Sequence, residues 1–234
     1  FQTALLKIAA CTNDKAITLL GYPEQGDDVV YSSIAIMMNG KIIGNHRKTV
    51  IPNLELYAEH RYFTEGIKIG RVISEELFSE TSDPTWGLLC CCAAFPWSRN
   101  LSIEREQYLH YLAREKQAPI IYVNNIGISN SLILEGCSSI TNADGNTLVL
   151  LRHFDEDAVI TSMNDMKDVE CPTYCKSDNY VKELYCAIKF VIKEFIRNTP
   201  QKKALILMDG SLNSQLSLYI AMKSLGPNQV AGLY

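Results

Sequence analysis

Asn39-Gly40 separates two apolar runs with alternating polarity, VVYSSIAIMM and KIIGNHRKTV. An Asn-Gly pair flanked in this way is the strongest short-range signal of a β-hairpin, because a tight two-residue turn needs positive φ at both positions. This stretch must therefore fold as an antiparallel strand pair. A second tight turn is expected at residues 142–145 (NADG), between strands at 132–140 and 147–153.

Hydrophobic periodicity assigns the other elements. Apolar residues at helical spacing predict amphipathic helices at 102–115 and 180–198, and residues 1–12 read as the end of a helix. Short apolar runs predict strands at residues 16–22, 67–78, 88–94 and 120–124. Near the carboxyl end, a strand at 202–208, a helix at 215–224 and a strand at 229–234 form a β-loop-α-β unit, which is typical of a parallel sheet.

These elements predict an α/β protein with two domains. The first, of layered helices and sheets, covers residues 1–157. A polar segment of little periodicity follows, and we interpret residues 158–178 of it as a linker. Residues 179–234 would then begin a second domain. A length of 234 residues fits one large domain with the start of another.

Composition excludes several classes of protein. A net charge of −4 and a pI near 5.6 argue against binding to nucleic acid or an anionic membrane surface. The apolar stretch WGLLCCCAAFPW is shorter than the roughly 20 residues that span a bilayer, so we expect no membrane segment.

The thiols and imidazoles predict no metal site. The four histidines are scattered, and Cys171 and Cys175 lack the second pair of a zinc motif. Adjacent Cys90, Cys91 and Cys92 would point to alternate faces of a strand, as buried hydrophobes rather than disulfides. Free thiols favour a reducing cytoplasmic location.

Several motifs together resemble one family, the glutamine-dependent NAD synthetases. The matching segments are NGKIIGNHRKTVIPN, LYAEHRYFTEG, IGRVISEELF, IIYVNNIGISNSLILEGCSSITNADGN and ALILMDGSLNSQLSLYIAMKSLGPNQVAGLY. The resemblance implies a nitrilase-like (carbon-nitrogen hydrolase) α-β-β-α sandwich that liberates ammonia from glutamine. It also implies the beginning of a Rossmann-like ATP-pyrophosphatase domain that amidates nicotinic acid adenine dinucleotide.

The family's glutaminase uses a Cys nucleophile, a Glu base and a Lys that steadies the oxyanion. Lys48 stands at the Lys position, and the matching residues around it favour this interpretation over a solvated surface lysine. Glu59 matches a second family Glu, and the nucleophile position holds Ser74. A serine hydroxyl needs a strong positioned base, whereas a thiol with a pKa of about 8.5 ionises readily. Cys91 is a poor replacement nucleophile, because the resemblance places Cys90, Cys91 and Cys92 on the next strand.

The family's phosphate loop, Ser-Gly-Gly-x-Asp-Ser, reads Asp-Gly-Ser-Leu-Asn-Ser at residues 209–214. Gly210 and Ser214 are kept and Ser211 stands at the second Gly, so these three are the candidate nucleotide-binding residues. Asp209 places a carboxylate where the phosphate should bind, and like charges repel. A plain strand-turn-helix corner is the competing interpretation. In the segment that matches residues 126–132, the family has polar or acidic residues at three positions where this chain has Ser or Asn. The neighbouring residues that pack in the family's core are kept.

Residues at core positions match the family, whereas residues at its catalytic and phosphate-binding positions do not. This pattern predicts a catalytically impaired pseudoenzyme with a structural, assembly or regulatory role. Its partner would be a second copy or another protein subunit, with a glutamine-like molecule as a candidate ligand, and no cofactor is expected. The alternative is a functional synthetase that uses ATP and Mg²⁺, or a residual amidase at Ser74 and Lys48. The family's first strand and base-bearing loop precede Phe1, so we expect a longer protein or a second chain to supply them.

Overall fold

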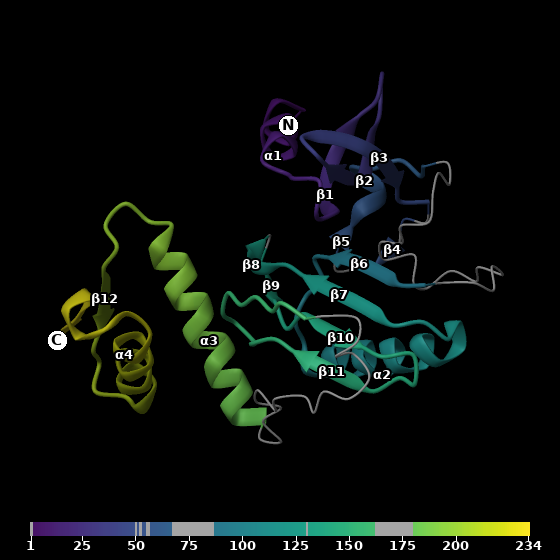
Figure 1. Ribbon diagram of the computed structural model, residues 1–234. Coiled ribbons are helices and arrows are strands. Elements are labelled where there is room, and N and C mark those ends of the chain that lie inside the picture. Colours follow the sequence, from purple (N-terminus) through teal and green to yellow (C-terminus); the bar gives the residue numbers. More distant parts are fainter. Residues whose placement is uncertain are drawn as a thin grey trace.

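The computed structural model describes residues 2–49, 51, 53–54, 57–66, 87–129, 131–161 and 180–234. The predicted strand at 67–78, with Ser74, lies outside these residues. So do Cys171, Cys175 and most of the predicted linker. Figure 1 shows a three-stranded sheet and a four-stranded sheet, followed by a long helix and a small carboxyl-terminal unit.

The first sheet has the strand order β1-β2-β3 and is antiparallel throughout, from β1 (Thr18–Gln25), β2 (Val30–Met38) and β3 (Lys41–Arg47). The predicted hairpin is confirmed, with φ of 50° at Asn39 and 73° at Gly40. Helix α1 (Gln2–Ala10) buries Leu5 and Ala9 against Ala35 and Met37. Two short strands, β4 (Asn53–Leu54) and β5 (Tyr57–Ala58), lead to the 3-10 turn η1 (Glu59–Arg61).

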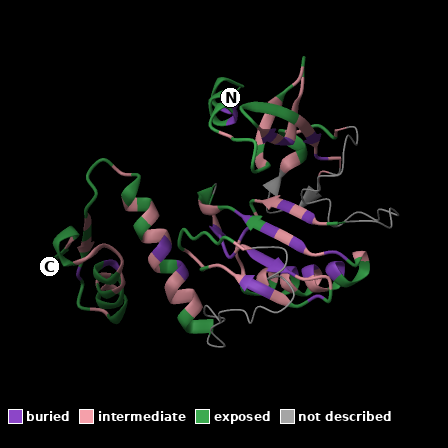
Figure 2. Ribbon diagram, viewed as in Figure 1, coloured by how far each residue is buried: buried purple, intermediate pink, exposed green. Residues whose placement is uncertain are grey.

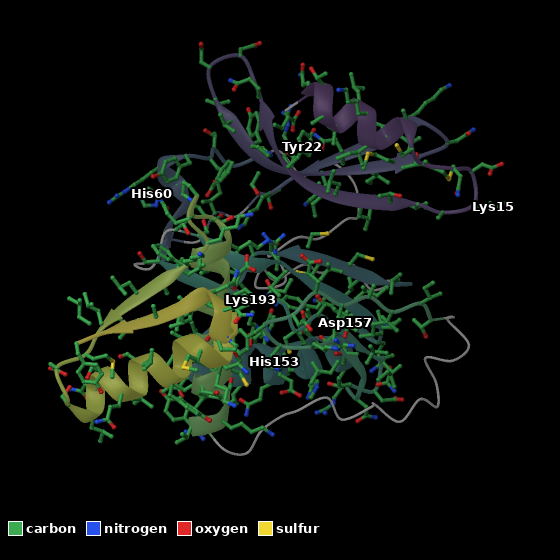
Figure 3. The ribbon with its side chains drawn as sticks, turned by 90° about the vertical axis from the view of Figure 1, so that its left-hand side faces the viewer. Lys15, Tyr22, His60, His153, Asp157 and Lys193 are labelled. Atoms are coloured by element: carbon green, nitrogen blue, oxygen red, sulfur yellow. The ribbon has the colours of Figure 1, made fainter. Side chains whose placement is uncertain are left out.

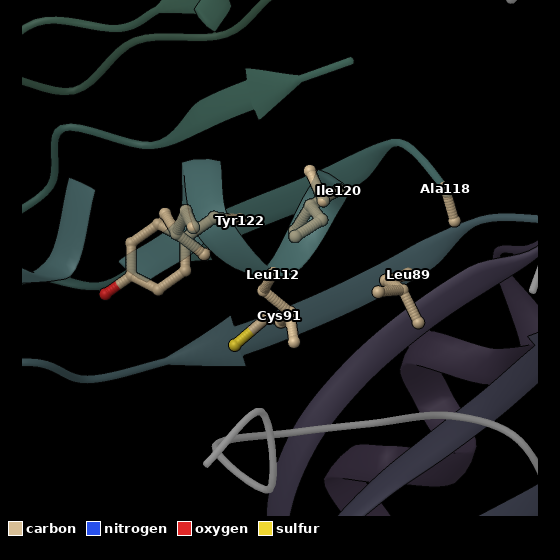
Figure 4. Packing of buried hydrophobic residues seen from close by; sticks show 8 residues of the cluster. Leu89, Cys91, Leu112, Ala118, Ile120 and Tyr122 are labelled. Carbon is tan, nitrogen blue, oxygen red and sulfur yellow. The ribbon is translucent and has the colours of Figure 1, made fainter. Parts of the chain in front are cut away.

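The second sheet has the order β11-β10-β7-β6. Its parallel pair is β6 (Leu89–Ala93) and β7 (Ile120–Asn124), and β10 (Ser139–Thr141) and β11 (Thr147–Leu150) add antiparallel strands. Helix α2 (Arg99–Lys116) covers one face, and its Leu112 packs among Leu89, Cys91 and Ile120 (Figure 4). Figure 2 shows buried positions running along these strands. This layer is the main core of the described chain.

The single strand predicted at 132–140 is wrong. The structure divides it into β9 (Leu132–Glu135), which pairs with β8 (Ile126–Ser129), and β10. The break falls at Gly136 and Cys137, whose φ values are 69° and 54°. A left-handed backbone cannot continue a strand. The chain therefore turns here, leaving the β8–β9 pair and entering the four-stranded sheet as β10. The turn predicted after β10 is confirmed, with Gly145 at φ 76°.

The carboxyl-terminal unit begins with helix α3 (Tyr180–Arg197) and continues through β12 (Ala204–Leu207), α4 (Leu212–Leu225), η4 (Pro227–Gln229) and β13 (Val230–Leu233). Strands β12 and β13 are parallel, so the predicted β-loop-α-β unit is confirmed. A hydrogen bond joins helix α3 to the chain after β6: Trp97 Nε1 donates to Glu183 Oε1 at 2.9 Å. None of the described helices is long and apolar enough to cross a membrane.

Candidate functional site

Lys48 is a buried residue, which excludes the alternative of a solvated surface lysine. It follows β3, where its amide donates to the carbonyl of Ser32 at 2.8 Å and its carbonyl accepts from the amide of Gly66 at 2.8 Å. Its side chain is 3% exposed, and Nζ donates to Glu59 Oε2 at 2.7 Å. The structure therefore joins two residues that the sequence only placed at separate family positions. Ser74, the third, lies outside the described residues.

A cavity of about 600 Å³ borders this ion pair. Strands β1 and β2 form one wall and the ends of β6 and β7 form another; its polar lining includes Tyr22, Ser33, Lys48, Glu59, Cys92 and Asn124. The volume suits a small-molecule ligand, and the buried ammonium offers a donor to a carbonyl or carboxylate oxygen.

The three adjacent cysteines alternate between faces, as expected for a strand. Cys91 is 1% exposed and lies in the core with Leu89 and Leu112, away from the cavity. Cys92 lines the cavity instead. Burial raises the pKa of the Cys92 thiol, and the neighbouring Cys90 raises it further. A neutral thiol is a weak nucleophile, so Cys92 is poorly suited to replace the family's cysteine.

A polar network on the first sheet supports the cavity wall, and no local sequence pattern predicts it. The Glu24 carboxylate accepts from Arg47 Nε at 2.9 Å and Nη2 at 2.7 Å, and from Ser33 Oγ and Asn45 Nδ2, both at 2.7 Å. Tyr22, labelled in Figure 3, donates to Asn45 Oδ1 at 3.3 Å. The hydrogen bonds from Arg47, with smaller ones from Ser33 and Asn45, outweigh burial and lower the pKa of Glu24 to about 2. Once the hairpin register is known, these polar residues fall on one face of three neighbouring strands.

Asn124 links the cavity to the loops behind it. Its side chain is buried at the end of β7, where Oδ1 accepts from the Phe95 amide at 2.8 Å and Nδ2 donates to the Gly136 carbonyl at 3.0 Å. These bonds hold the chain after β6 against the break between β9 and β10. Asn124 is therefore a positioning residue rather than a free ligand donor.

In the loop at residues 209–214, the carboxylate of Asp209 binds donors of the same loop. Asp209 Oδ1 accepts from the Ser211 amide at 3.0 Å and from Ser211 Oγ at 2.6 Å. These bonds, with a contribution from Ser214, hold the pKa of Asp209 well below its usual range, so the carboxylate is charged. Gly210 takes a φ of 80°, which favours glycine.

Ser211 acts as the N-cap of α4, because its Oγ accepts from the Ser214 amide at 3.2 Å. This cap explains why α4 begins at Leu212, three residues before the predicted start. The three candidate residues Gly210, Ser211 and Ser214 are thus brought together at a helix amino terminus, with the carboxylate of Asp209 beside them.

Comparison with known proteins identifies relatives that match the motifs. The chain is 26% identical to the glutamine-dependent NAD(+) synthetase of Xylella fastidiosa over 252 residues, covering 99% of this chain and 46% of that protein. It is 22% identical to the synthetase of Thermotoga maritima, with 98% of this chain and 48% of that protein covered. The chain therefore spans about half the length of the curated relatives it matches. No protein-family model matches it.

Solved structures show the same fold. The glutamine-dependent NAD+ synthetase of Acinetobacter baumannii, solved with ADP, superposes with a TM-score of 0.87 at 23% identity, over 99% of this chain and 47% of that one. A carbon-nitrogen hydrolase from Helicobacter pylori gives a TM-score of 0.53 at 17% identity, over 64% of this chain and 62% of that one. The resemblance to NAD synthetases and the α/β fold class are confirmed.

Proposed function

We propose that this chain is a catalytically impaired NAD-synthetase-like protein whose fold serves a structural, assembly or regulatory role. The observation that carries the proposal is the Asp209 carboxylate, which accepts hydrogen bonds from the amide and hydroxyl of Ser211 in its own loop. Phosphate-binding loops work because such donors point at the ligand at a helix amino terminus. Here an internal anion already takes them, and its charge repels a second anion.

The amidase half supports the same proposal. Ser74 occupies the nucleophile's family position, and the cavity's own thiol, Cys92, has a raised pKa. Lys48 and Glu59 nevertheless keep a buried ion pair beside a cavity of about 600 Å³. Binding of a small amide such as glutamine without turnover is therefore the ligand chemistry that we propose for this half.

Restoring the loop should restore phosphate binding. We expect isothermal titration calorimetry to detect no binding of inorganic pyrophosphate to the wild-type chain at millimolar concentration. Asp209→Ser should raise the affinity at least about 10-fold, because it frees the Ser211 amide and removes the repelling charge. Asp14→Ser, which removes an equal charge from an exposed loop, should not. Micromolar binding by the wild-type chain would contradict the proposal for this half.

Glutamine hydrolysis should be absent. We expect no ammonia release above background and no acyl-enzyme mass after incubation with glutamine, measured by a coupled assay and by intact-mass spectrometry. Ser74→Ala should leave both readings unchanged, because a serine hydroxyl is a far weaker nucleophile near neutral pH than the family's cysteine thiolate. Turnover that Ser74→Ala abolishes would instead establish a residual serine-dependent amidase.

The assembly role has its own test. A chain used for its surface should associate with a second copy or with another protein subunit. Light scattering and native mass spectrometry at micromolar concentration should therefore detect a homo-oligomer, or a copurifying subunit of fixed stoichiometry. A strict monomer without such a subunit would count against this role while leaving the two ligand tests intact.

A further inference from the structure

A buried group of charged side chains lies between α2 and the strand break, outside the cavity of Lys48. Glu135, at the end of β9, is 0% exposed. Its Oε1 accepts from Arg105 Nη1 at 2.7 Å and from Ser102 Oγ at 2.8 Å, both on α2. Its Oε2 lies 3.0 Å from His153 Nδ1. His153 follows β11 and is labelled in Figure 3.

The other nitrogen of His153 contacts a thiol. His153 Nε2 lies 2.9 Å from Cys137 Sγ, so Cys137, His153 and Glu135 form a continuous thiol-imidazole-carboxylate series. The backbone fixes this arrangement, because the Cys137 amide donates to the Arg152 carbonyl at 3.2 Å and Gly136 forms a β-bridge with His153. This is the order of groups that activates a cysteine nucleophile, with the carboxylate orienting the imidazole.

The thiol and the imidazole both border a cavity of about 350 Å³. Its lining is mostly contributed by α2, β10 and β11, and shares no residue with the lining of the Lys48 cavity. Cys137 is only 5% exposed, so a reactant must be small to reach it.

The surroundings of His153 favour its protonated form, which can donate a proton during the reaction. Burial lowers the pKa of His153, but its close contacts with Cys137 and Glu135 and their charges outweigh burial and raise the pKa to about 10. The other charged side chains that line the cavity are Arg99 and Glu106 of α2 and Glu183 of α3.

A metal is a weaker interpretation of the same residues. Ligand atoms of Glu135, His153 and Glu183 lie within 4.8 Å of one another. However, Glu135 already pairs with the Arg105 guanidinium, and Glu183 already accepts a hydrogen bond from Trp97. A fixed positive charge on one ligand opposes a cation, so the arrangement favours thiol chemistry.

We propose that Cys137, His153 and Glu135 form a nucleophilic thiol site whose reactant is a small hydroperoxide. The thiolate sulfur attacks one peroxide oxygen, so an S–O bond forms and the O–O bond breaks. The departing oxygen takes the proton from His153 and leaves as water or an alcohol. Cys137 is oxidised by two electrons to a sulfenic acid, and the peroxide is reduced. The site is independent of the function proposed above.

The pH dependence of oxidation tests the site. The intact chain is treated with hydrogen peroxide at pH 6 and pH 8.5, quenched with catalase, denatured and alkylated, and each cysteine's loss of alkylation is measured by peptide mass spectrometry. The rate at Cys137 should change less than about 3-fold between the two pH values. An ordinary thiol should react on the order of 100-fold faster at pH 8.5, because its thiolate fraction rises. The exposed Cys11 is the internal reference.

Two variants separate activation from mere accessibility. His153→Asn should slow oxidation of Cys137 at pH 6 at least about 10-fold and give it the pH dependence of the reference thiol. His60→Asn, the same change at an exposed histidine of η1, should preserve the wild-type profile. A Cys137 that resists peroxide in the folded chain, or whose rate follows that of Cys11, overturns the proposal even if His153→Asn fails to fold.

Discussion

Replacing Glu135 with alanine is expected to lower the free energy of unfolding by about 3–5 kcal/mol. The carboxylate is fully buried, accepts hydrogen bonds from Arg105 and Ser102, and lies beside the imidazole of His153. Burial raises its pKa, but the hydrogen bonds and charges of His153 and Arg105 outweigh this and lower it, so the group is an anion. Its removal leaves the Arg105 guanidinium, 8% exposed, without its buried counter-charge. Urea denaturation followed by circular dichroism measures the loss.

Two control variants show whether the loss comes from the unpaired charge. Arg105→Met combined with Glu135→Leu removes both charges and should recover most of the stability, since an apolar pair of similar volume often replaces a buried ion pair at little cost. Ser102→Ala should cost only about 1 kcal/mol, the value of one hydrogen bond. A double variant no more stable than Glu135→Ala would contradict this explanation.

Acid should destabilise the wild-type chain more than it destabilises Glu24→Gln. The pKa of Glu24 falls from an ordinary value of 4.5 to about 2, chiefly because Arg47 donates to it. A lowered pKa means that the unfolded chain binds the proton more tightly. The contribution is therefore present above about pH 4.5 and is lost as the pH falls toward 2. Allowing for partial solvent screening, we expect the difference to amount to about 1 kcal/mol between pH 6 and pH 3.

Urea denaturation across that pH range measures the effect. Glu24→Gln should be less stable than the wild-type chain at pH 6, and the difference between the two should narrow, without vanishing, as the pH falls to 3. Glu65→Gln, a change at an exposed carboxylate, should instead follow the wild-type curve. Equal acid sensitivity of Glu24→Gln and the wild-type chain would show that the Arg47 pair contributes nothing.

Much of the fold was predictable because its signals are local. The hairpin at Asn39-Gly40 follows from the φ values that two adjacent residues accept. The prediction at residues 120–124 coincides with β7, since the apolar run IIYVN is one complete strand. The strand predicted at 132–140 failed because two consecutive left-handed residues, Gly136 and Cys137, break it, and apolar periodicity carries no information about φ.

The sites were less predictable because their contacts are distant in sequence. Lys48 and Glu59 could be found only as separate positions of a resembling family, and their ion pair depends on how the chain folds between residue 48 and η1. Arg105 and Glu135 are 30 residues apart, and nothing near either residue indicates that they meet.

The sequence alone determined which chemical groups the chain possesses: a serine where the resembling family has its nucleophile, an aspartate where that family's phosphate loop begins, and a hairpin and a β-loop-α-β unit. Only the tertiary structure decided their state. It buried Lys48, turned the carboxylate of Asp209 onto its own loop, and aligned Cys137 with His153 and Glu135. The reason is physical: local propensity follows from neighbouring residues, whereas burial and charge pairing depend on segments that meet only after folding.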